Sequence, residues 1–419
     1  MTRRLQKKTI LFILDDFHIG GLASFVNTYV RYLNDKGYHT IVIGEDGESL
    51  HHGEYFIGSE VVSLPQSPFA ERHTNLFTYL LYRVHFFWKF IHAYNIIRKK
   101  EKIHVIHFNL TWGPIALLLF APSVYNYPRV ITFYGDFALE HKSRVGVVHG
   151  LGDLRLIVKT AGLALAQGVS LAFSSRIIVF SEYAKKLVMQ RFRISQKKID
   201  VIAGSINFHE YQLPTSAPQF ILDHKHIHLL NISRFENRKG HDILLQAFDI
   251  LLKNKLPVRL TICGPITGEI YHVLKVYERL KLRDSVSFLH AVTTQEKAFL
   301  MRKADIFVMP SKELETFGLT IVEAFACGTP VIGTPVGAIP EILSLVDRRL
   351  IARSTKPEHL AASIARYIRL DNKEKDRIKK KCQRVALQYF DSVFVLKRLE
   401  SLYESISSQR GVGSFIRKQ

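Results

Sequence analysis

Short apolar runs alternate with stretches of helical periodicity along most of this sequence. The first run covers residues 9–14, apolar residues then recur at helical spacing over 22–33, and the next run lies at 39–44. Later runs, each followed by a segment long enough for a helix, lie at 104–108, 129–133 and 176–180. Strands that alternate with helices favour a parallel sheet. The chain is therefore predicted to have an α/β fold.

The alternation is interrupted once. Residues 208–226 contain two prolines and short polar stretches with little periodicity, and the alternation resumes at 227. We therefore expect an N-terminal Rossmann-like domain over 1–207, a linker, and a C-terminal Rossmann-like domain over 227–385. A final helical segment over 386–419 is expected to pack back toward the first domain. Ligands of open parallel sheets bind beyond the carboxyl ends of the strands, so the two domains are expected to face each other across a cleft.

Basic residues outnumber acidic residues in the chain. The 58 Lys and Arg residues against 37 Asp and Glu residues give a formal net charge of +21. Such a charge attracts anionic lipid, nucleic acid or phosphorylated ligands, unless it only reflects the general composition of the host. No RNA-binding motif accompanies the charge, so we expect no nucleic-acid partner.

Cysteine and histidine usage points away from a metal site. Cys263, Cys327 and Cys382 form no CxxC pair, which argues against a disulfide framework and fits a reducing cytosol. The 19 histidines show no paired ligand spacing, so we expect neither a metal nor another cofactor. The short apolar run near the N-terminus meets Asp15 and Asp16, which favours a first strand over a signal peptide. No uninterrupted apolar run of about 18 residues predicts a membrane-spanning helix.

The richest chemical signal lies in residues 313–343. A strand leads into a loop, the segment 317–319 then opens a helix, and free N–H groups at a helix start suit a phosphate. Glu315 lies just before this helix and Glu323 within it, so both carboxylates can accept hydrogen bonds from hydroxyls of a sugar and a ribose. Two glutamates by themselves would indicate only acidic residues near the positive end of a helix. The long glycine and proline punctuation around them favours a ligand site.

A second signal lies in residues 231–248. Arg234 follows an apolar run, and Lys239 with Gly240 opens a helix. An arginine and a lysine in this position can neutralise a diphosphate and stabilise it as charge develops on a leaving group. Arg238 stays open between that role and an ordinary surface cation.

The spacing of Glu315 and Glu323, followed by CGTPVIGTPVGAIPE, resembles glycosyltransferase family four, a retaining family with the GT-B fold. The resemblance implies that Glu315 contacts hydroxyls of the donor sugar and that Glu323 contacts the ribose of the nucleotide. The segment around Arg234 and Lys239 resembles the Arg…Lys-Gly element of the family, so these two residues and Glu315 are the implied catalytic residues. The resemblance also implies that sugar and phosphate bind at the main chain of Phe317, Gly318, Leu319 and Thr320.

Two further loops are implied to bind the donor. Gly20 and Gly21 follow the first apolar run and allow the main chain to approach a ligand closely. The family uses such a pair near the donor phosphate and the acceptor. Ala291 falls in the loop that holds the base in relatives, where His290 replaces a common glycine and leaves the identity of the base open.

Three residues at strand ends, Tyr134, His107 and Asn109, are candidates for the acceptor side. Tyr134 stands where the family often has a histidine, and a tyrosine can donate a hydrogen bond but does not titrate near neutrality. Asn109 occupies what is often a second histidine position, and Asn207 stands at the hinge where an aspartate is usual. The alternative for the three candidates is an ordinary packed or hydrogen-bonded residue.

Residues 76–100 form an aromatic-rich segment of helical length that is interrupted by Arg83 and Lys89 and ends in a basic cluster. Such a segment suits a helix that lies in the interface of an anionic membrane. The alternative is a core helix with a basic end. We expect peripheral membrane contact through this segment, in the cytoplasm at the inner face of the cell membrane.

Together these features predict a retaining glycosyltransferase of the hexosyltransferase class. It would move a hexose-type sugar from a nucleotide-diphosphate sugar to a glycan or lipid-linked acceptor, in the synthesis of cell-envelope polysaccharide or glycolipid. A non-catalytic relative that binds a sugar nucleotide or a glycan is the alternative, suggested by Tyr134 and Asn207. A Rossmann-type dehydrogenase would need GxGxxG after the first strand, which DDFHIGGLAS lacks.

Overall fold

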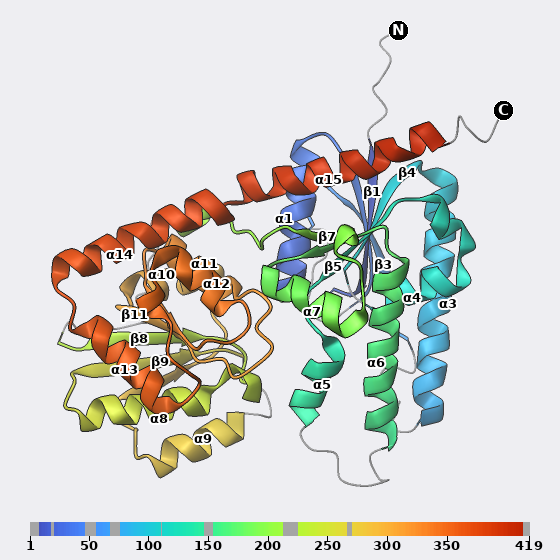
Figure 1. The fold of residues 1–419 in the computed structure, drawn as a ribbon. Coiled ribbons are helices and arrows are strands. Elements are labelled where there is room, and N and C mark those ends of the chain that lie inside the picture. Colours follow the sequence, from blue (N-terminus) through green and yellow to red (C-terminus); the bar gives the residue numbers. More distant parts are fainter. Residues whose placement is uncertain are drawn as a thin grey trace. The chain divides into compact units, whose positions relative to one another are not determined.

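The chain forms two compact units in the computed structural model (Figure 1). The first unit comprises residues 1–180, 185–202 and 396–419, and the second comprises residues 181–184 and 203–395. The residues that the structure describes are 8–17, 21–46, 56–67, 76–109, 111–145, 154–212, 225–265 and 270–413.

The first unit is built on a seven-stranded parallel sheet. Its strands are β1 (Thr9–Asp16), β2 (His39–Glu45), β3 (Glu60–Leu64), β4 (Ile103–Phe108), β5 (Arg129–Phe133), β6 (Arg176–Val179) and β7 (Ile199–Val201). Their order across the sheet is β3-β2-β1-β4-β5-β6-β7. The first six residues of the central strand β1 are all buried, which explains why its sequence is continuously apolar rather than alternating.

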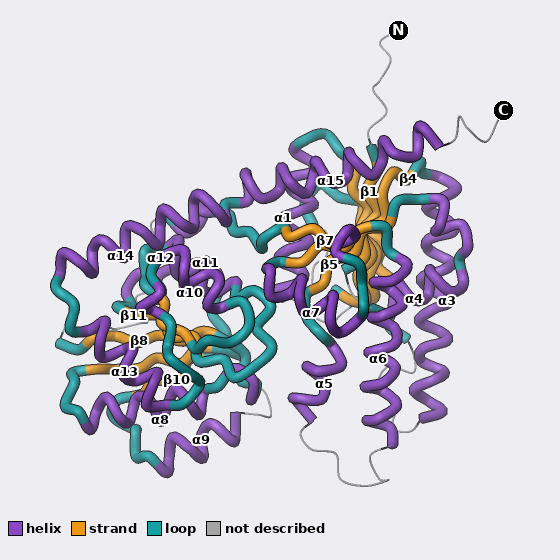
Figure 2. Tube along the Cα trace, viewed as in Figure 1, coloured by secondary structure: helices purple, strands orange, loops and turns teal. Residues whose placement is uncertain are grey.

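Helices pack around this sheet (Figure 2). They are α1 (Gly21–Asp35), α3 (Leu76–Lys100), α4 (Trp112–Phe120), α5 (Phe137–Val145), α6 (Leu154–Phe173), α7 (Glu182–Phe192) and the part of α15 (Ser392–Gly413) from Leu396 onward. Helix α3 packs against α4 and against the edge strand β3, and α4 packs against α6.

The second unit is built on a five-stranded parallel sheet. Its strands are β8 (Ile227–Ile232), β9 (Val258–Cys263), β10 (Val286–Leu289), β11 (Ile306–Met309) and β12 (Val331–Gly333), in the order β10-β9-β8-β11-β12. Its main helices are α8 (His241–Lys253), α9 (Ile270–Arg279), α10 (Thr294–Lys303), α11 (Leu319–Ala326), α12 (Ile339–Val346), α13 (Pro357–Ile368) and α14 (Asn372–Val385).

Short helical turns complete both units, namely η1 (Pro122–Asn126), η3 (Gln196–Lys198), η4 (Phe208–Tyr211), η5 (Asn237–Lys239), η6 (Arg348–Leu350) and η7 (Ala386–Phe390). The linker expected over 208–226 begins with η4, and its residues 213–224 lie outside the described residues. The predicted parallel strands are present in both units. The sequence did not predict β3, because this short edge strand is only partly buried and lacks a continuous apolar run.

Candidate functional site

The loop between β11 and α11 carries Glu315 and ends at Gly318. Gly318 has a φ of 91°, and a side chain there would lie 2.8 Å from the side chain of Ile321. Glycine adopts this left-handed conformation without steric cost, so the chain can turn directly from the loop into the helix. Helix α11 therefore begins at Leu319, with free N–H groups at its first turn. Phe317 is buried beside this turn, and Leu319 and Thr320 are half-buried.

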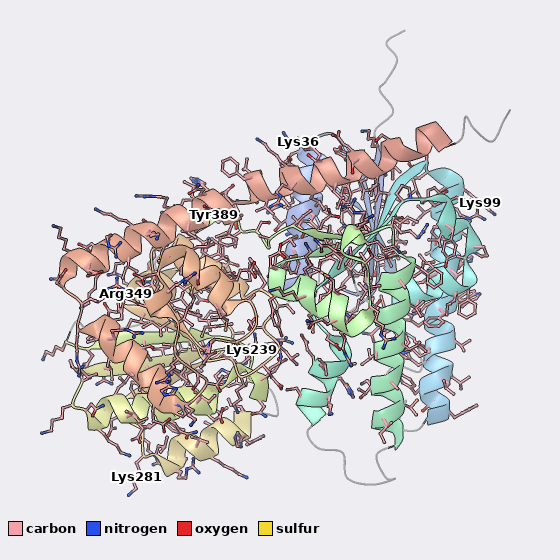
Figure 3. All side chains as sticks on the ribbon, in the orientation of Figure 1. Lys36, Lys99, Lys239, Lys281, Arg349 and Tyr389 are labelled. Carbon is pink, nitrogen blue, oxygen red and sulfur yellow. The ribbon has the colours of Figure 1, made fainter. Side chains whose placement is uncertain are left out.

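Glu315 and Lys239, predicted in separate segments, meet in the structure (Lys239 is labelled in Figure 3). Lys239 Nζ lies 2.7 Å from Glu315 Oε2, and Ser311 Oγ donates to the same oxygen at 3.3 Å. Burial raises the pKa of the Glu315 carboxyl, but the Lys239 ammonium, with Arg238 and the Ser311 hydroxyl, outweighs burial and holds that pKa below its usual value. Glu315 is therefore an ionised hydrogen-bond acceptor at neutral pH.

Arg238 stabilises the main chain just before Glu315. Its buried guanidinium donates to Glu236 Oε2 at 2.8 Å and to the carbonyl of Leu314 at 3.2 Å. Leu314 has a φ of 56°, a left-handed conformation that costs a non-glycine residue about 1–3 kcal/mol and that clusters at functional sites. Arg238, which the sequence left open, is thus a buried residue that supports the loop. Nothing in the sequence pattern pointed to Glu236 or Leu314.

Arg234 lies directly after β8 and pairs with the same carboxylate as Arg238. Its Nη1 atom lies 2.9 Å from Glu236 Oε1, and half of its side chain is exposed. Glu236 therefore orients both arginines. The exposed part of Arg234 is accessible to an anionic ligand, whereas Arg238 is not.

Two glycines bring neighbouring loops against the Glu315 loop. A side-chain carbon on Gly240 would lie 2.0 Å from the carbonyl oxygen of Pro310, and one on Gly337 would lie 2.0 Å from that of Glu315. Both glycines have positive φ, and the N–H of Ala338 donates to the Glu315 carbonyl at 2.8 Å. Because no side chain fits at either position, the loops after β8 and β12 are held firmly against the loop after β11.

Glu323 lies on α11 with its two carboxylate oxygens in different situations. Oε1 accepts a hydrogen bond from the Tyr211 hydroxyl at 2.7 Å and another from the Lys297 ammonium. Oε2 is buried and has no hydrogen-bond partner among the described residues. A buried acceptor without a partner is costly, so Oε2 is the carboxylate oxygen that still lacks a hydrogen-bond donor. The sequence did not point to Tyr211 or Lys297, because neither belongs to a motif and both reach Glu323 through the fold.

The remaining donor candidates lie on other loops. Ala291 is exposed directly after β10, and Cys263 Sγ donates to the preceding carbonyl of His290 at 3.0 Å. Gly21 is the first residue of α1 in the first unit. Gly20 lies outside the described residues.

Two of the three acceptor-side candidates form a pair in the first unit. The Tyr134 hydroxyl donates to Asn109 Oδ1 at 3.0 Å, just beyond the carboxyl ends of the neighbouring strands β5 and β4. His107 is instead fully buried, with Nδ1 bonded to the Tyr403 hydroxyl and Nε2 to Thr132 Oγ1 at 2.7 Å. Burial lowers the pKa of His107 to about 3, so its ring is neutral. Both ring nitrogens are engaged inside the protein, and the contact of His107 with an acceptor stays a prediction.

Within the described ranges, no three His, Cys, Asp or Glu side chains are close enough together to hold a metal ion. No helix in that part of the chain is long and apolar enough to cross a membrane. The three cysteines are unpaired and buried, and burial raises the pKa of Cys263 to about 11 and that of Cys327 to about 12. The pKa of Cys382 is also raised by burial.

Both halves of the chain match models of glycosyltransferase families. Residues 19–210 match the model described as Glycosyltransferase Family 4, and residues 214–384 match the model described as Glycosyl transferases group 1. The chain belongs to glycosyltransferase family four. The loop with Glu315 and the helix with Glu323 lie within the second match.

This family-four chain is similar over part of its length to curated glycosyltransferases. It is 28% identical over 207 residues to the D-inositol 3-phosphate glycosyltransferase of Segniliparus rotundus. The aligned region covers 48% of this chain and 46% of that protein. The chain is 25% identical over 319 residues to the phosphatidylinositol N-acetylglucosaminyltransferase gpi3 subunit of Schizosaccharomyces pombe, which covers 68% of this chain and 67% of that one. The chain thus spans less than half the length of the first relative.

The family-four fold is also found in solved structures. The structure of Anabaena HepE in complex with UDP and glucose superposes with a TM-score of 0.71 at 20% identity, over 95% of this chain and 100% of HepE. At this level of identity the likeness concerns the fold. The predicted fold class, two parallel-sheet α/β domains as in GT-B glycosyltransferases, is therefore confirmed.

Proposed function

We propose that this chain is a retaining glycosyltransferase that moves a hexose-type sugar from a nucleotide-diphosphate sugar to a glycan or lipid-linked acceptor. The observation that carries the proposal is the ionised Glu315 carboxylate, with Lys239 Nζ 2.7 Å away, beside the free start of α11. The carboxylate can accept hydrogen bonds from sugar hydroxyls. The ammonium and the helix start can hold a diphosphate next to it.

Each group then has a separate part in the reaction. Glu315 orients the donor sugar, and Glu323 holds the ribose through Oε2. Lys239 and Arg234 stabilise the diphosphate as negative charge develops on the leaving group. A phosphate oxygen of the donor takes the proton of the acceptor hydroxyl, as the family resemblance implies, so we name no protein base.

The acceptor side of the proposal is supported by the relatives. The two relatives described above are named for transfer to an inositol phosphate and to phosphatidylinositol. An acceptor of similar chemistry, phosphorylated or lipid-linked, would suit a chain with a net charge of +21. We therefore propose a role in the synthesis of glycolipid or of cell-envelope polysaccharide.

Hydrolysis of UDP-, GDP- and ADP-glucose in the absence of acceptor tests the proposed site. Lys239→Ala should lower the rate at least about 100-fold, because removing one group that stabilises developing charge costs about 10²–10³ in rate. Glu315→Ala should lower the rate by about the same factor, because the donor sugar is then no longer held in its reactive orientation. Lys312→Ala is the matched control, since Lys312 lies in the same loop but pairs with Asp242 at 2.8 Å. Wild-type rates in either site variant would refute the assignment. Donor binding by thermal shift without any hydrolysis by the wild type would favour the non-catalytic alternative.

We also propose that α3 lies on the surface of an anionic membrane. The two cations that interrupt its sequence are engaged within the first unit, because Lys89 pairs with Glu45 and Arg83 lies 4.2 Å from the centroid of the Trp112 ring. Three cations occupy the last turn of the helix. An apolar row that ends in cations is typical of an interfacial helix, which supports a cytoplasmic protein at the inner face of the membrane. The exposed row of α3 consists of Phe77, Leu80, Val84, Trp88 and Ile96.

A further inference from the structure

An open groove of about 560 Å³ lies between β3 and α3 in the first unit, and we call it the α3 groove. Its walls come from alternate residues of the edge strand and from the side of the helix that faces this strand. A volume of this size is in the range of small-molecule sites, which are also lined mainly by apolar side chains. The apolar walls include Val62, Leu64, Ala93, Ile96 and Ile97.

One end of the α3 groove carries a cation whose charge is compensated. Lys89 is buried there, donates to the carbonyl of Pro65 and pairs with the Glu45 carboxylate. Tyr82 donates to the same carboxylate at 3.0 Å. The polar groups at this end are therefore paired with one another, and the groove surface that remains for a ligand is mainly apolar.

The other end of the α3 groove lies beside the basic last turn of α3. Lys100 lines this end, is exposed, and follows Arg98 and Lys99 in the last turn of α3 (Lys99 is labelled in Figure 3). Two carboxylates, those of Glu60 and Glu101, also line this end, whereas Arg98 and Lys99 do not, so the three cations of the last turn outnumber these carboxylates by one. An anionic head group is thus electrostatically complementary to this end.

The groove opens along the exposed row of α3. Trp88 and Ile96 belong to the row and also line the groove. If α3 lies on a membrane as proposed above, the hydrocarbon chain of a lipid can therefore enter the groove from the side, between these residues. The lining helix residues run from His85 to Glu101, a length of about 24 Å at the rise of an α-helix, which suits an extended hydrocarbon chain.

We propose that the α3 groove binds one hydrocarbon chain of an anionic membrane lipid, with the head group at Lys100. The proposal goes beyond the transfer reaction, because none of the residues assigned to that reaction, Glu315, Lys239 and Glu323, lines the groove.

Titration with alkyl phosphates, kept below the concentration at which they form micelles, tests the proposal. The sequence has two tryptophans, so Trp112→Phe leaves Trp88 as the one fluorescent reporter in the groove. Dodecyl phosphate should change the emission of Trp88 in a saturable way. Affinity should rise about fourfold per added methylene from the octyl to the dodecyl compound, because each buried CH₂ contributes a fixed increment.

Variants in the groove separate chain binding from general adhesion. Ala93→Phe fills the groove, and Ile96→Asp places a charge on its wall, so each should weaken dodecyl phosphate binding at least about tenfold. Val84→Ser changes the exposed row outside the groove and should leave the affinity within about twofold. Lys100→Glu should weaken binding of dodecyl phosphate but not of dodecanol. Melting temperatures confirm that each variant is folded.

Three results would overturn the proposal. The first is unchanged affinity in both Ala93→Phe and Ile96→Asp. The second is the absence of saturation at Trp88 before micelles form. The third is a dimer of the wild-type chain that Ala93→Phe dissociates, which would assign the groove to a second copy of this protein.

Discussion

Lys239 and Glu315 form a buried ion pair whose members are proposed to hold different parts of one ligand. Removal of one partner from such a pair leaves an uncompensated buried charge, which is more costly than never having had the pair. The lowered pKa of Glu315 stabilises the folded state above the ordinary carboxyl pKa, and this stabilisation is lost as the pH falls through the lowered value. The cation therefore contributes to both the position and the charge of the carboxylate.

Lys239→Met should shift the pH–rate profile of donor hydrolysis. The acid limb of this profile, where the rate falls as Glu315 becomes protonated, should move to higher pH. In the wild type, the ammonium is the largest of the influences that together overcome the effect of burial on the pKa of Glu315. Without it, burial dominates and raises that pKa, so we expect the acid limb to rise by more than about one pH unit. The residual rate of the variant, measured across the pH range, checks this. An acid limb that does not move would mean that another group controls it.

Glu323 should hold one ribose hydroxyl rather than two. Its Oε1 atom is already engaged by Tyr211 and Lys297, and Oε2 has no partner in the described part of the chain. Of the 2′-deoxy and 3′-deoxy forms of the nucleoside diphosphate that binds, we expect one to lose at least about tenfold in affinity and the other less than about threefold. A hydrogen bond to a charged group contributes about 1.5–3 kcal/mol. Calorimetric titration of the three compounds measures both losses.

The double variant Lys297→Leu and Tyr211→Phe is the control for this asymmetry. It releases Oε1, so both deoxy compounds should then bind more weakly than the parent diphosphate. Equal losses for the two deoxy compounds in the wild-type protein would show that Glu323 holds both hydroxyls and that the observed contacts rearrange on binding.

At the scale of elements, α3 packs against the first unit with one side and is proposed to contact a membrane with the other, and its sequence does not show which residues belong to which side. Arg83 and Lys89 interrupt the apolar pattern, but the structure shows both side chains engaged with the first unit, over Trp112 and with Glu45. The side of the helix that remains outermost is therefore more apolar than the sequence suggests. The basic last turn adds an electrostatic attraction that salt can screen.

The protein should float with vesicles that contain anionic lipid and should be released by about 0.5 M salt, which shortens electrostatic range to a few ångströms. Val84→Glu, in the exposed row, should reduce the bound fraction severalfold because it places a charge in the apolar interface. Tyr271→Glu on α9, an equally exposed position in the second unit, is the control and should have no effect. Failure of the wild type to bind anionic vesicles at any salt concentration would refute membrane docking.

Elements with strong local signals were predictable from the sequence. The buried strands were visible as apolar runs, and the segment from the β11–α11 loop to β12 was visible through its glycines and through Glu315 and Glu323. The β3 strand was not, because an edge strand with partly buried residues lacks such a run. The inward direction of Arg238 and the approach of Tyr211 and Lys297 to Glu323 were not predictable either. These contacts join residues that only the folded chain brings together.

At the scale of the molecule, the C-terminal helix returns the chain to its first unit. Helix α15 contacts the first sheet and α1 through the pair of Tyr403 with His107 and through the hydrogen bond from Tyr32 to Glu400 at 2.9 Å. Arg398 also donates to the carbonyl of Val201 at 3.0 Å. The first unit is thus assembled from segments that lie far apart in the sequence, and its stability depends on α15.

Tyr403→Phe should destabilise the first unit by about 1–3 kcal/mol, because it leaves the buried Nδ1 of His107 without its partner. For a unit of this size we expect a fall in melting temperature of roughly 2–4 °C per kcal/mol. Tyr38→Phe, which removes a longer and more exposed contact to Glu404, should have a smaller effect. Calorimetry measures both. A large loss of transfer rate in His107→Phe at an unchanged melting temperature would instead support contact between His107 and the acceptor.

The burial of all three cysteines makes the protein suitable for site-specific labelling without removal of native residues. The thiols of Cys263, Cys327 and Cys382 are shielded from solvent, and their raised pKa values keep them protonated at neutral pH. Cysteines introduced in place of exposed Lys36 and Lys253, one in each unit, would then react first with a maleimide dye. Energy transfer between two such dyes would report the distance between the two units in solution as a nucleotide sugar is added.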